Sequence, residues 1–331
     1  MRIATYNVEW FSNLFDDRGH LLDDTRWSGR YNVKRFEQLE ALGIVFNALD
    51  ADGVMIIEAP DSHRKRDGVG ALERFADIMG LRARRAVMGF VNDTQQEIAF
   101  LYDPDVMQVE HAPQGTPRFD EAYKIDLNVD AEPEKVRWSK PPLELAIKTA
   151  SGASIRAIGV HAKSKAPHGA RTPQEAMRIA IENRRKQLAQ CIWLRERVDD
   201  HLDFGDALVV LGDFNDGPGL DEYEKLFGRS SIEIVMGAEG DIPLFDPHAA
   251  ALIGLRPGPL HASARFWLAD QKRWMETLLD YVMVSPDLVG RADDWRIWHP
   301  VDDTRIADVP ELARALLTAS DHFPVSVEFD I

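Results

Sequence analysis

Polar side chains recur in this sequence where apolar, β-branched runs end. The clearest case is the run at residues 208–211, which is followed by Gly212, Asp213, Phe214 and Asn215. If the strand continues to Asn215, its period of two places Asp213 and Asn215 on one face. A carboxylate and an amide there can orient a water and hold a phosphoryl oxygen. The alternative is an Asx turn that closes the strand. The fully apolar run before Asp213 favours the catalytic interpretation.

Two other runs end in candidate ligands for a divalent cation. Asn7 and Glu9 lie two residues apart near the N-terminus, and Glu58 ends the apolar run at residues 54–57. A glutamate is costly to bury there unless it is paired or bound to a cation. Amide and carboxylate oxygens suit Mg²⁺ or Mn²⁺ rather than zinc. The alternatives are a polar strand edge for Asn7 and Glu9, and a capping or ion-paired glutamate at Glu58.

A histidine and two lysines follow the run at residues 155–160. His161 can donate a hydrogen bond to a phosphoryl oxygen, although a single histidine at a strand end is often structural. Lys163 and Lys165 are better suited to contact phosphate, or to stay solvated, than to act as catalysts. We therefore treat the two lysines as candidate phosphate contacts.

An aspartate–histidine pair is the fourth feature. Asp280 opens the run at residues 281–284, and Asp321 and His322 directly precede the run at residues 325–329. A carboxylate partner fixes the tautomer of an imidazole and raises its basicity. Adjacent residues point in different directions, so we expect His322 to pair with Asp280 while Asp321 faces a metal or the water. A capped turn is the alternative for Ser320, Asp321 and His322.

The elements that must position these residues are mostly strands. Apolar, β-branched runs predict strands at residues 3–8, 54–57, 98–102, 155–160, 207–211, 281–284 and 325–329. Helical patterns occupy residues 32–49, 173–198 and, briefly, 221–227. Thr172 is a candidate N-cap with Pro173 at the first helical position. The first helix should bury a stripe formed by Phe36, Leu39, Leu42, Ile44 and Phe46. Helices do not follow every strand, so stacked sheets flanked by helices fit better than a doubly wound sheet. Residues 229–274 lack a periodic apolar pattern and are expected to be an irregular insertion.

Composition narrows the class of protein. The chain has 331 residues, a net charge of −16, one cysteine and no apolar run of membrane-spanning length. Without a signal-peptide pattern at its start, we expect a cytoplasmic protein. The acidity counts against general nucleic-acid binding. Residues 63–85 and 161–186 nevertheless each carry seven Lys or Arg, against three and two acidic residues. These segments could steer a phosphorylated substrate, or could be solvated helix faces. The eight tryptophans are expected to serve packing rather than base stacking.

Taken in order, these motifs resemble the endonuclease/exonuclease/phosphatase superfamily. That superfamily includes abasic-site endonucleases, pancreatic-type deoxyribonucleases, inositol-phosphate 5-phosphatases and neutral sphingomyelinases. The resemblance runs from the first strand to the last, and its most specific parts are Gly-Asp213-Phe-Asn215 and Ser-Asp321-His322. It implies an α+β fold, a four-layer αββα sandwich with two stacked mixed sheets flanked by helices. It also implies one domain spanning residues 1–331.

The resemblance also implies a role for each candidate. Glu58 would be the principal ligand of Mg²⁺ or Mn²⁺, supported by Asn7 and Glu9, and Asp321 would complete the metal and water network. Asp213 would orient or deprotonate the attacking water. Asn215 and His161 would contact phosphoryl oxygens, and Asp280 would hold His322, which stabilises the charge on phosphorus. Glu9 stands where a shorter aspartate is frequent, and it keeps a second metal open beside the expected single one.

Three functions remain open at this level. The first is a nuclease or phosphodiesterase acting on nucleic acid or nucleotides, favoured by Lys163, Lys165 and the basic segment that contains Asn183, Arg184 and Arg185. The second is a phosphatase or phosphodiesterase for lipid headgroups or small phosphorylated metabolites, which the overall acidity favours. The third is a non-catalytic binding module, against which the complete polar set argues. No obligate protein partner is evident from the sequence.

Overall fold

Two β-sheets form the centre of the computed structural model, which describes residues 1–92, 94, 96–125, 134–167, 169–217, 228–254, 261–268 and 272–331. The six-stranded sheet contains, in spatial order, β14 (Ala292–Ile297), β15 (Val325–Phe329), β1 (Arg2–Asn7), β2 (Gly53–Pro60), β4 (Gln96–Tyr102) and β3 (Arg85–Met88). The five-stranded sheet contains β13 (Asp280–Val284), β10 (Leu208–Asp213), β9 (Ser154–His161), β8 (Leu143–Thr149) and β5 (Met107–His111). Both sheets are mixed, since β1 runs parallel to β2, and β9 to β10, while the other pairs are antiparallel.

The sheets pack face to face, as the alternation of their side chains requires. In β2, Met55 and Ile57 belong to the core shared with the five-stranded sheet, whereas Val54 and Ile56 belong to a second core under the helices. Gly159 of β9 permits this close packing, because a side chain there would collide with Met55 of the opposite sheet. The predicted arrangement of two stacked mixed sheets flanked by helices is confirmed.

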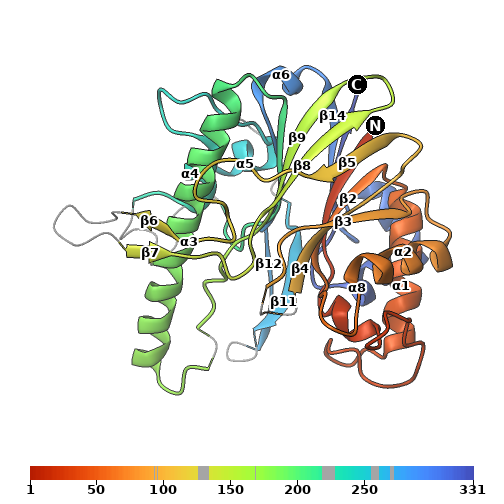
Figure 1. Ribbon diagram of the computed structural model, residues 1–331. Helices are drawn as coiled ribbons and strands as arrows, with labels where there is room; N and C mark the ends of the chain where they lie inside the picture. The colour runs from red at the N-terminus through yellow and green to blue at the C-terminus, as the bar shows by residue number, and fades with distance from the viewer. Residues whose placement is uncertain are drawn as a thin grey trace.

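Helices cover the outer faces of both sheets (Figure 1). The helices α1 (Arg35–Leu49), α2 (Gly68–Met79) and α8 (Pro310–Ala319) share the second core with the six-stranded sheet. The long helix α3 (Pro173–Asp203) packs on the other side, against the five-stranded sheet. Among the described residues, no helix combines the length and apolarity that crossing a bilayer requires.

The apolar runs of the sequence form strands where they were predicted, and the two long helices also form. Thr172 caps α3 by accepting a hydrogen bond from the backbone N–H of Glu175, as its position before Pro173 predicts. The stripe of the first helix is partly wrong. Phe36 is exposed and Ile44 only half-buried, because α1 begins at Arg35 and directs Leu39, Leu42, Val45, Phe46 and Leu49 inward. The helix predicted at residues 221–227 lies outside the described residues.

The segment at residues 229–274 is more regular than its composition predicts. Its described part contains α4 (Ser231–Met236), α5 (Pro247–Leu252) and β11 (Ala264–Leu268), which pairs with β12 (Arg273–Thr277). Local capping explains both helices, since Ser230 and Asp246 accept hydrogen bonds from backbone N–H groups in the first turns. Such elements are too short to show a periodic apolar pattern. The remaining elements are η1 (Phe11–Leu14), β6 (Tyr123–Ile125), β7 (Glu134–Val136), α6 (Pro286–Val289) and α7 (Thr304–Ala307).

Candidate active site

The ends of strands from both sheets meet at one place. Asn7 ends β1 in one sheet and Asp213 ends β10 in the other, and the Asn7 side-chain amide donates a 3.0 Å hydrogen bond to the Asp213 carboxylate. Asp280 begins β13 directly opposite Asp213 in the antiparallel register. His322 immediately precedes β15, the antiparallel neighbour of β1. The sheet topology therefore converts large separations in sequence into a single cluster.

Asp213 and Asn215 are held together by a turn rather than by continued strand geometry. The strand β10 ends at Asp213, and Asn215 has a left-handed backbone with φ of 51°. Asp213 accepts the backbone N–H of Asn215 at 2.7 Å and its side-chain amide at 3.1 Å. The strand therefore does not continue to Asn215, and the Asx turn that was the alternative itself places the two side chains side by side. Gly212 has φ of 141°, and a side chain there would collide with the backbone of Val160.

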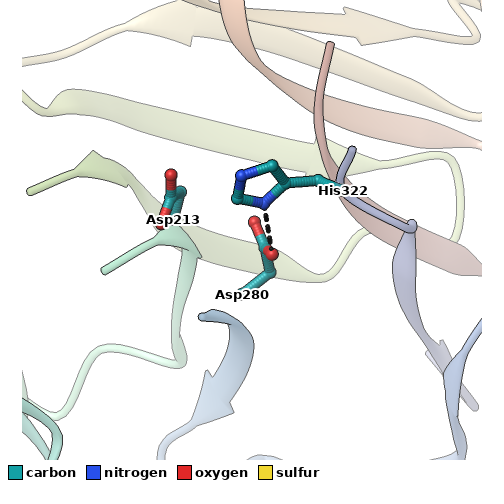
Figure 2. A group of neighbouring side chains, drawn as sticks. All are labelled: Asp213, Asp280 and His322. Atoms are coloured by element: carbon teal, nitrogen blue, oxygen red, sulfur yellow. Dashed lines mark hydrogen bonds and ion pairs between the residues drawn. The ribbon is translucent and has the colours of Figure 1, made fainter. Parts of the chain in front are cut away.

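Asp280 and His322 form the expected pair, drawn in Figure 2. The Nδ1 of His322 lies 2.8 Å from the Asp280 carboxylate, which also accepts a 2.7 Å hydrogen bond from Ser263. Burial alone would lower the pKa of His322, but the nearby charges of Asp280, Asp213 and Asp321 outweigh it and hold the pKa well above the usual value. This raised pKa favours the imidazolium form of His322, whose Nε2 can donate to an anion.

Asp213 is suited to accept a proton near neutral pH. Burial raises its pKa to about 7, although the positive charge of His322 acts in the opposite direction. A general base works best when its pKa lies near the working pH. Asp213, Asp280 and His322 also place one potential ligand atom each within 4.8 Å of one another. A protonated His322 cannot ligate a cation, so this group can either hold a metal or move protons, depending on the charge of His322.

A second group of carboxylates surrounds Asn7 on the six-stranded sheet. Burial and the neighbouring charge of Asp321 raise the pKa of Glu9 to about 7, and burial also raises the pKa of Glu58. Glu58 sits at a bulge in β2, where its backbone adopts φ of 64°, an uncommon conformation for a glutamate. Carboxylates that repel one another in a partly buried place call for a cation.

The donor set fits a hard divalent cation. The Oδ1 atom of Asn7 is buried without a hydrogen-bond partner among the described residues, and Glu58 and Asp321 supply further oxygens nearby. Glu9 is less available, because it forms an ion pair with Arg30, a residue the sequence did not single out. Oxygen ligands of this kind match Mg²⁺ or Mn²⁺. The residues present therefore fit the metal that the resemblance implies, and Asn7, Glu58 and Asp321 are the candidates to hold it.

Lys140 is a member of the site that the sequence did not reveal. Its ammonium lies 3.1 Å from the Nε2 of His161, and the charges of Glu58 and Asp213 act on it. His161 is buried, and burial together with Lys140 holds the pKa of its imidazole well below the usual value. His161 is thus a neutral acceptor for Lys140, and the lysine, rather than the histidine, presents a donor to the site. Only the Lys140-Pro141-Pro142 sequence before β8 could have indicated this position.

The two lysines predicted to contact phosphate differ in the structure. Lys165 donates a 2.9 Å hydrogen bond to the buried carboxylate of Asp216, so its ammonium is engaged in an internal ion pair. Lys163 is half-exposed, and partial burial and the charge of Lys186 lower its pKa. Of the two, the geometry favours Lys163 as a contact for an anionic substrate.

Side chains of the basic segment of α3 point into the protein and support the turn that contains Asp213 and Asn215. Arg184 is fully buried and donates a 2.7 Å hydrogen bond to Asp216. Gln187 donates 3.0 Å hydrogen bonds to the backbone carbonyls of Phe214 and Asn215. Asn183 bonds the Ala166 carbonyl at 2.9 Å. The side chains of Asn183 and Arg184 are therefore used inside the protein, so they do not add to the support that the basic segment gives to a nuclease.

Comparison with known proteins adds to this geometry. No model of a protein family and no curated protein sequence matches the chain. Solved structures do match over their whole length, with 100% of each chain covered: the 3′ phosphatase NExo from Neisseria bound to a product DNA hairpin (17% identity, TM-score 0.52), an AP endonuclease from Archaeoglobus fulgidus (14%, 0.51) and a mannosyl-6-phosphatase from Bacteroides thetaiotaomicron (14%, 0.50). The architecture that the motif resemblance implies is thereby confirmed, and the chain shares its fold with these two phosphatases and the endonuclease.

Proposed function

We propose that the chain hydrolyses phosphate esters, using Mg²⁺ or Mn²⁺ and in-line attack of a water, and that its substrates are phosphodiesters of nucleic acids or nucleotides. The observation that carries the proposal is the hydrogen bond between Asn7 and Asp213. It joins the carboxylates of the six-stranded sheet to Asp213 of the five-stranded sheet, which lies beside Asp280 and His322. Hydrolysis of a phosphodiester needs both halves at once, namely charge neutralisation and an activated water in line with the leaving group.

Each step of the proposed hydrolysis is assigned to particular residues of the chain. Asn7, Glu58 and Asp321 would hold the cation, which when bound would neutralise charge on the phosphoryl group. Asp213 accepts a proton from the water, and Asn215 keeps the Asp213 carboxylate oriented. His322, fixed by Asp280, donates from Nε2 to the oxygen on which charge builds.

Lys140 provides a further positive charge at the site. Because its ammonium faces Glu58, Asp213 and His161 together, it can reach a non-bridging oxygen of a phosphate bound among them. Lys163 would then contact the more exposed part of the substrate. A complete set of acid, base and anion donors is the reason to propose an enzyme rather than a binding module.

The second candidate function is a phosphatase or phosphodiesterase for small phosphorylated metabolites or lipid headgroups. The net charge of −16 favours it, and so do the internal ion pairs of the basic segment at residues 63–85. Five of its seven cations pair with carboxylates of the protein, namely Lys65, Arg66, Arg82, Arg84 and Arg85. Among the structurally similar proteins, two are named for action on DNA or are bound to it and one for action on a sugar phosphate. The fold therefore does not distinguish between the two functions, and the distinction depends on the surface residues of this chain.

A hydrolysis panel tests the proposal. Plasmid DNA, single-stranded oligonucleotides, RNA, bis-p-nitrophenyl phosphate, a sugar phosphate and a phosphoinositide would each be incubated with Mg²⁺, Mn²⁺ or EDTA. We expect metal-dependent cleavage of the diesters. Turnover confined to monoesters or to the phosphoinositide would favour the second function, and no turnover of any substrate would contradict both.

The dependence of catalysis on pH is a direct prediction. We expect kcat/KM for bis-p-nitrophenyl phosphate to rise with pH through about 7, because the raised pKa of Asp213 leaves it protonated and inactive as a base below that value. At alkaline pH the rate should fall as His322, whose pKa is well above the usual range, loses its proton. Steady-state profiles of the wild type and of His322→Gln check this. A falling limb that persists in the variant would contradict the role of His322.

Removing Lys140 should weaken catalysis without unfolding the chain. For Lys140→Met we expect kcat/KM to fall about 10²-fold, the usual effect of losing one donor to a charged transition state. The NMR titration of His161 provides an independent readout, because loss of the neighbouring ammonium should raise the lowered pKa of this imidazole. Lys165→Met serves as a comparison, since that ammonium pairs with Asp216 away from His161. A wild-type kcat/KM in Lys140→Met would remove the lysine from the site.

A further inference from the structure

The hairpin formed by β11 and β12 is attached directly to the candidate active site. The backbone N–H of Arg265 donates a 2.7 Å hydrogen bond to the carbonyl of Asp321, and that of Phe323 donates a 2.6 Å bond to the carbonyl of Ser263. The Ser263 hydroxyl also donates to Asp280. From this attachment the hairpin projects away from the sheets, between α3 and the half that contains α1 and α8 (Figure 1).

Two tryptophans face one another on this hairpin. Trp267 and Trp274 are partners in the antiparallel register, with ring centroids 5.6 Å apart and planes inclined by 68°. They remain 49% and 54% exposed, so about half of each ring is open to contact with a ligand. The guanidinium of Arg265 lies 4.7 Å from the ring centre of Trp274, on the same face of the hairpin.

A purely structural role does not account for the pair. Cross-strand aromatic contacts stabilise a two-stranded hairpin, but about half of each ring still faces water. Exposed aromatic rings beside a candidate catalytic site are a feature of ligand-binding surfaces. The hairpin also carries Arg265, Lys272 and Arg273 on a chain whose net charge is −16. Aromatic rings interleaved with cations suit a ligand with flat faces and a phosphate backbone.

We infer that Trp267 and Trp274 form a stacking platform for an unpaired nucleobase next to the scissile phosphate, which makes single-stranded nucleic acid the substrate class. The inference rests on the proposed function. Trp267 lies two residues beyond Arg265 along β11, about 7 Å from the residue that bonds Asp321. A nucleotide adjoining the scissile phosphate can therefore reach the rings while its phosphate stays at the site.

Base stacking would also determine which form of nucleic acid binds, which contacts to phosphate alone would not do. Every base has a π-face, so a platform of this kind binds single strands with little preference for sequence, whereas paired bases in a duplex have their faces covered. The net acidity of the chain fits this as well, because stacking does not depend on the broad basic surface that duplex binding requires.

The experiment compares two ligands that differ only in their bases. An oligothymidylate and an abasic oligonucleotide of equal length, both fluorescently labelled, would be titrated by anisotropy with Mg²⁺ against the full chain carrying Asp213→Asn, which prevents turnover. We expect the base-bearing strand to bind about tenfold more tightly. In that background Trp267→Ala or Trp274→Ala should abolish the difference, and the corresponding Phe variants should retain part of it.

Phe204→Ala is the matched control. This phenylalanine is 82% exposed and follows α3 near the start of β10, at the opposite end of that strand from Asp213, so the preference for bases should remain. Equal binding of both oligonucleotides, a preference that survives both alanine variants, or no binding of either strand would overturn the inference. Hydrolysis of bis-p-nitrophenyl phosphate by the wild type reports on the proposed function separately, because this substrate contains no nucleobase.

Discussion

Replacing Asp213 with asparagine should lower kcat by about 10²- to 10⁴-fold and at the same time raise the melting temperature. The first effect follows because the amide cannot accept the proton of the attacking water, and a positioned general base contributes this much. The second follows from burial. A carboxyl whose pKa is raised to about 7 binds its proton more tightly in the folded than in the unfolded chain, so its ionisation above that pH opposes folding.

The stability gain should have a characteristic pH dependence. Each unit of pKa difference corresponds to about 1.4 kcal/mol, so above pH 7 the penalty on the wild type is on the order of a few kcal/mol. Below the pKa of an unfolded aspartate, about 4, both states are protonated and the difference should vanish. Thermal unfolding of both proteins across this range, without added metal, measures it.

Asp246→Asn is the matched control for this pair of effects. Asp246 is also a buried aspartate with a raised pKa, but it caps α5 and accepts hydrogen bonds from the backbone N–H groups of His248, Ala249 and Val282. These donors are backbone groups with fixed positions, so an amide cannot satisfy all of them, whereas the side-chain amides of Asn7 and Asn215 that donate to Asp213 can turn. For Asp246→Asn we therefore expect a lower melting temperature with kcat close to that of the wild type. A melting temperature of Asp213→Asn below that of the wild type, or an unchanged kcat, would contradict our assignment of Asp213.

The site residues that can be predicted from the sequence are those that lie at the ends of strands. Asp213, Asp280 and His322 follow or precede apolar runs, and sheet topology alone brings such positions to one edge. The pairing of His322 with Asp280 was predictable for the same reason. Glu58 was recognisable as an ionisable group at the end of an apolar run, although its bulge was not, because a bulge depends on the register of the neighbouring strand β4.

Residues that reach the site from loops or helices were not predictable. Arg30 pairs with Glu9 from a loop, and Lys140 approaches His161 from the segment before β8. Neither position is fixed by a periodic pattern. The burial of Arg184 was not predictable either, because a charge in a sequence does not reveal whether it faces solvent or a buried partner, here Asp216. Trp267 was missed because short strands with one exposed face look irregular in sequence.

Replacing Glu58 with glutamine should weaken binding of Mg²⁺ or Mn²⁺ by at least about 100-fold, since loss of even an indirect partner of a metal ligand costs 10- to 100-fold. Thermal stability provides a readout that does not require turnover. At a metal concentration 100 times the dissociation constant, the wild type should gain about 2.7 kcal/mol, whereas a 100-fold weaker variant at that concentration should gain only about 0.4 kcal/mol. Without metal the variant should be the more stable protein, because burial raises the pKa of Glu58 and its charge opposes folding.

Two comparison variants locate the cation. Glu9→Gln should cause a smaller loss of metal binding, because the Glu9 carboxylate is already neutralised by Arg30. Asp280→Asn should leave the metal-induced gain largely intact, since Asp280 holds His322 rather than a cation. If Asp280→Asn abolished the gain and Glu58→Gln preserved it, the cation would lie among Asp213, Asp280 and His322, whose potential ligand atoms lie within 4.8 Å of one another. His322 would then be a neutral ligand instead of an acid, and the fall of kcat/KM at alkaline pH should disappear.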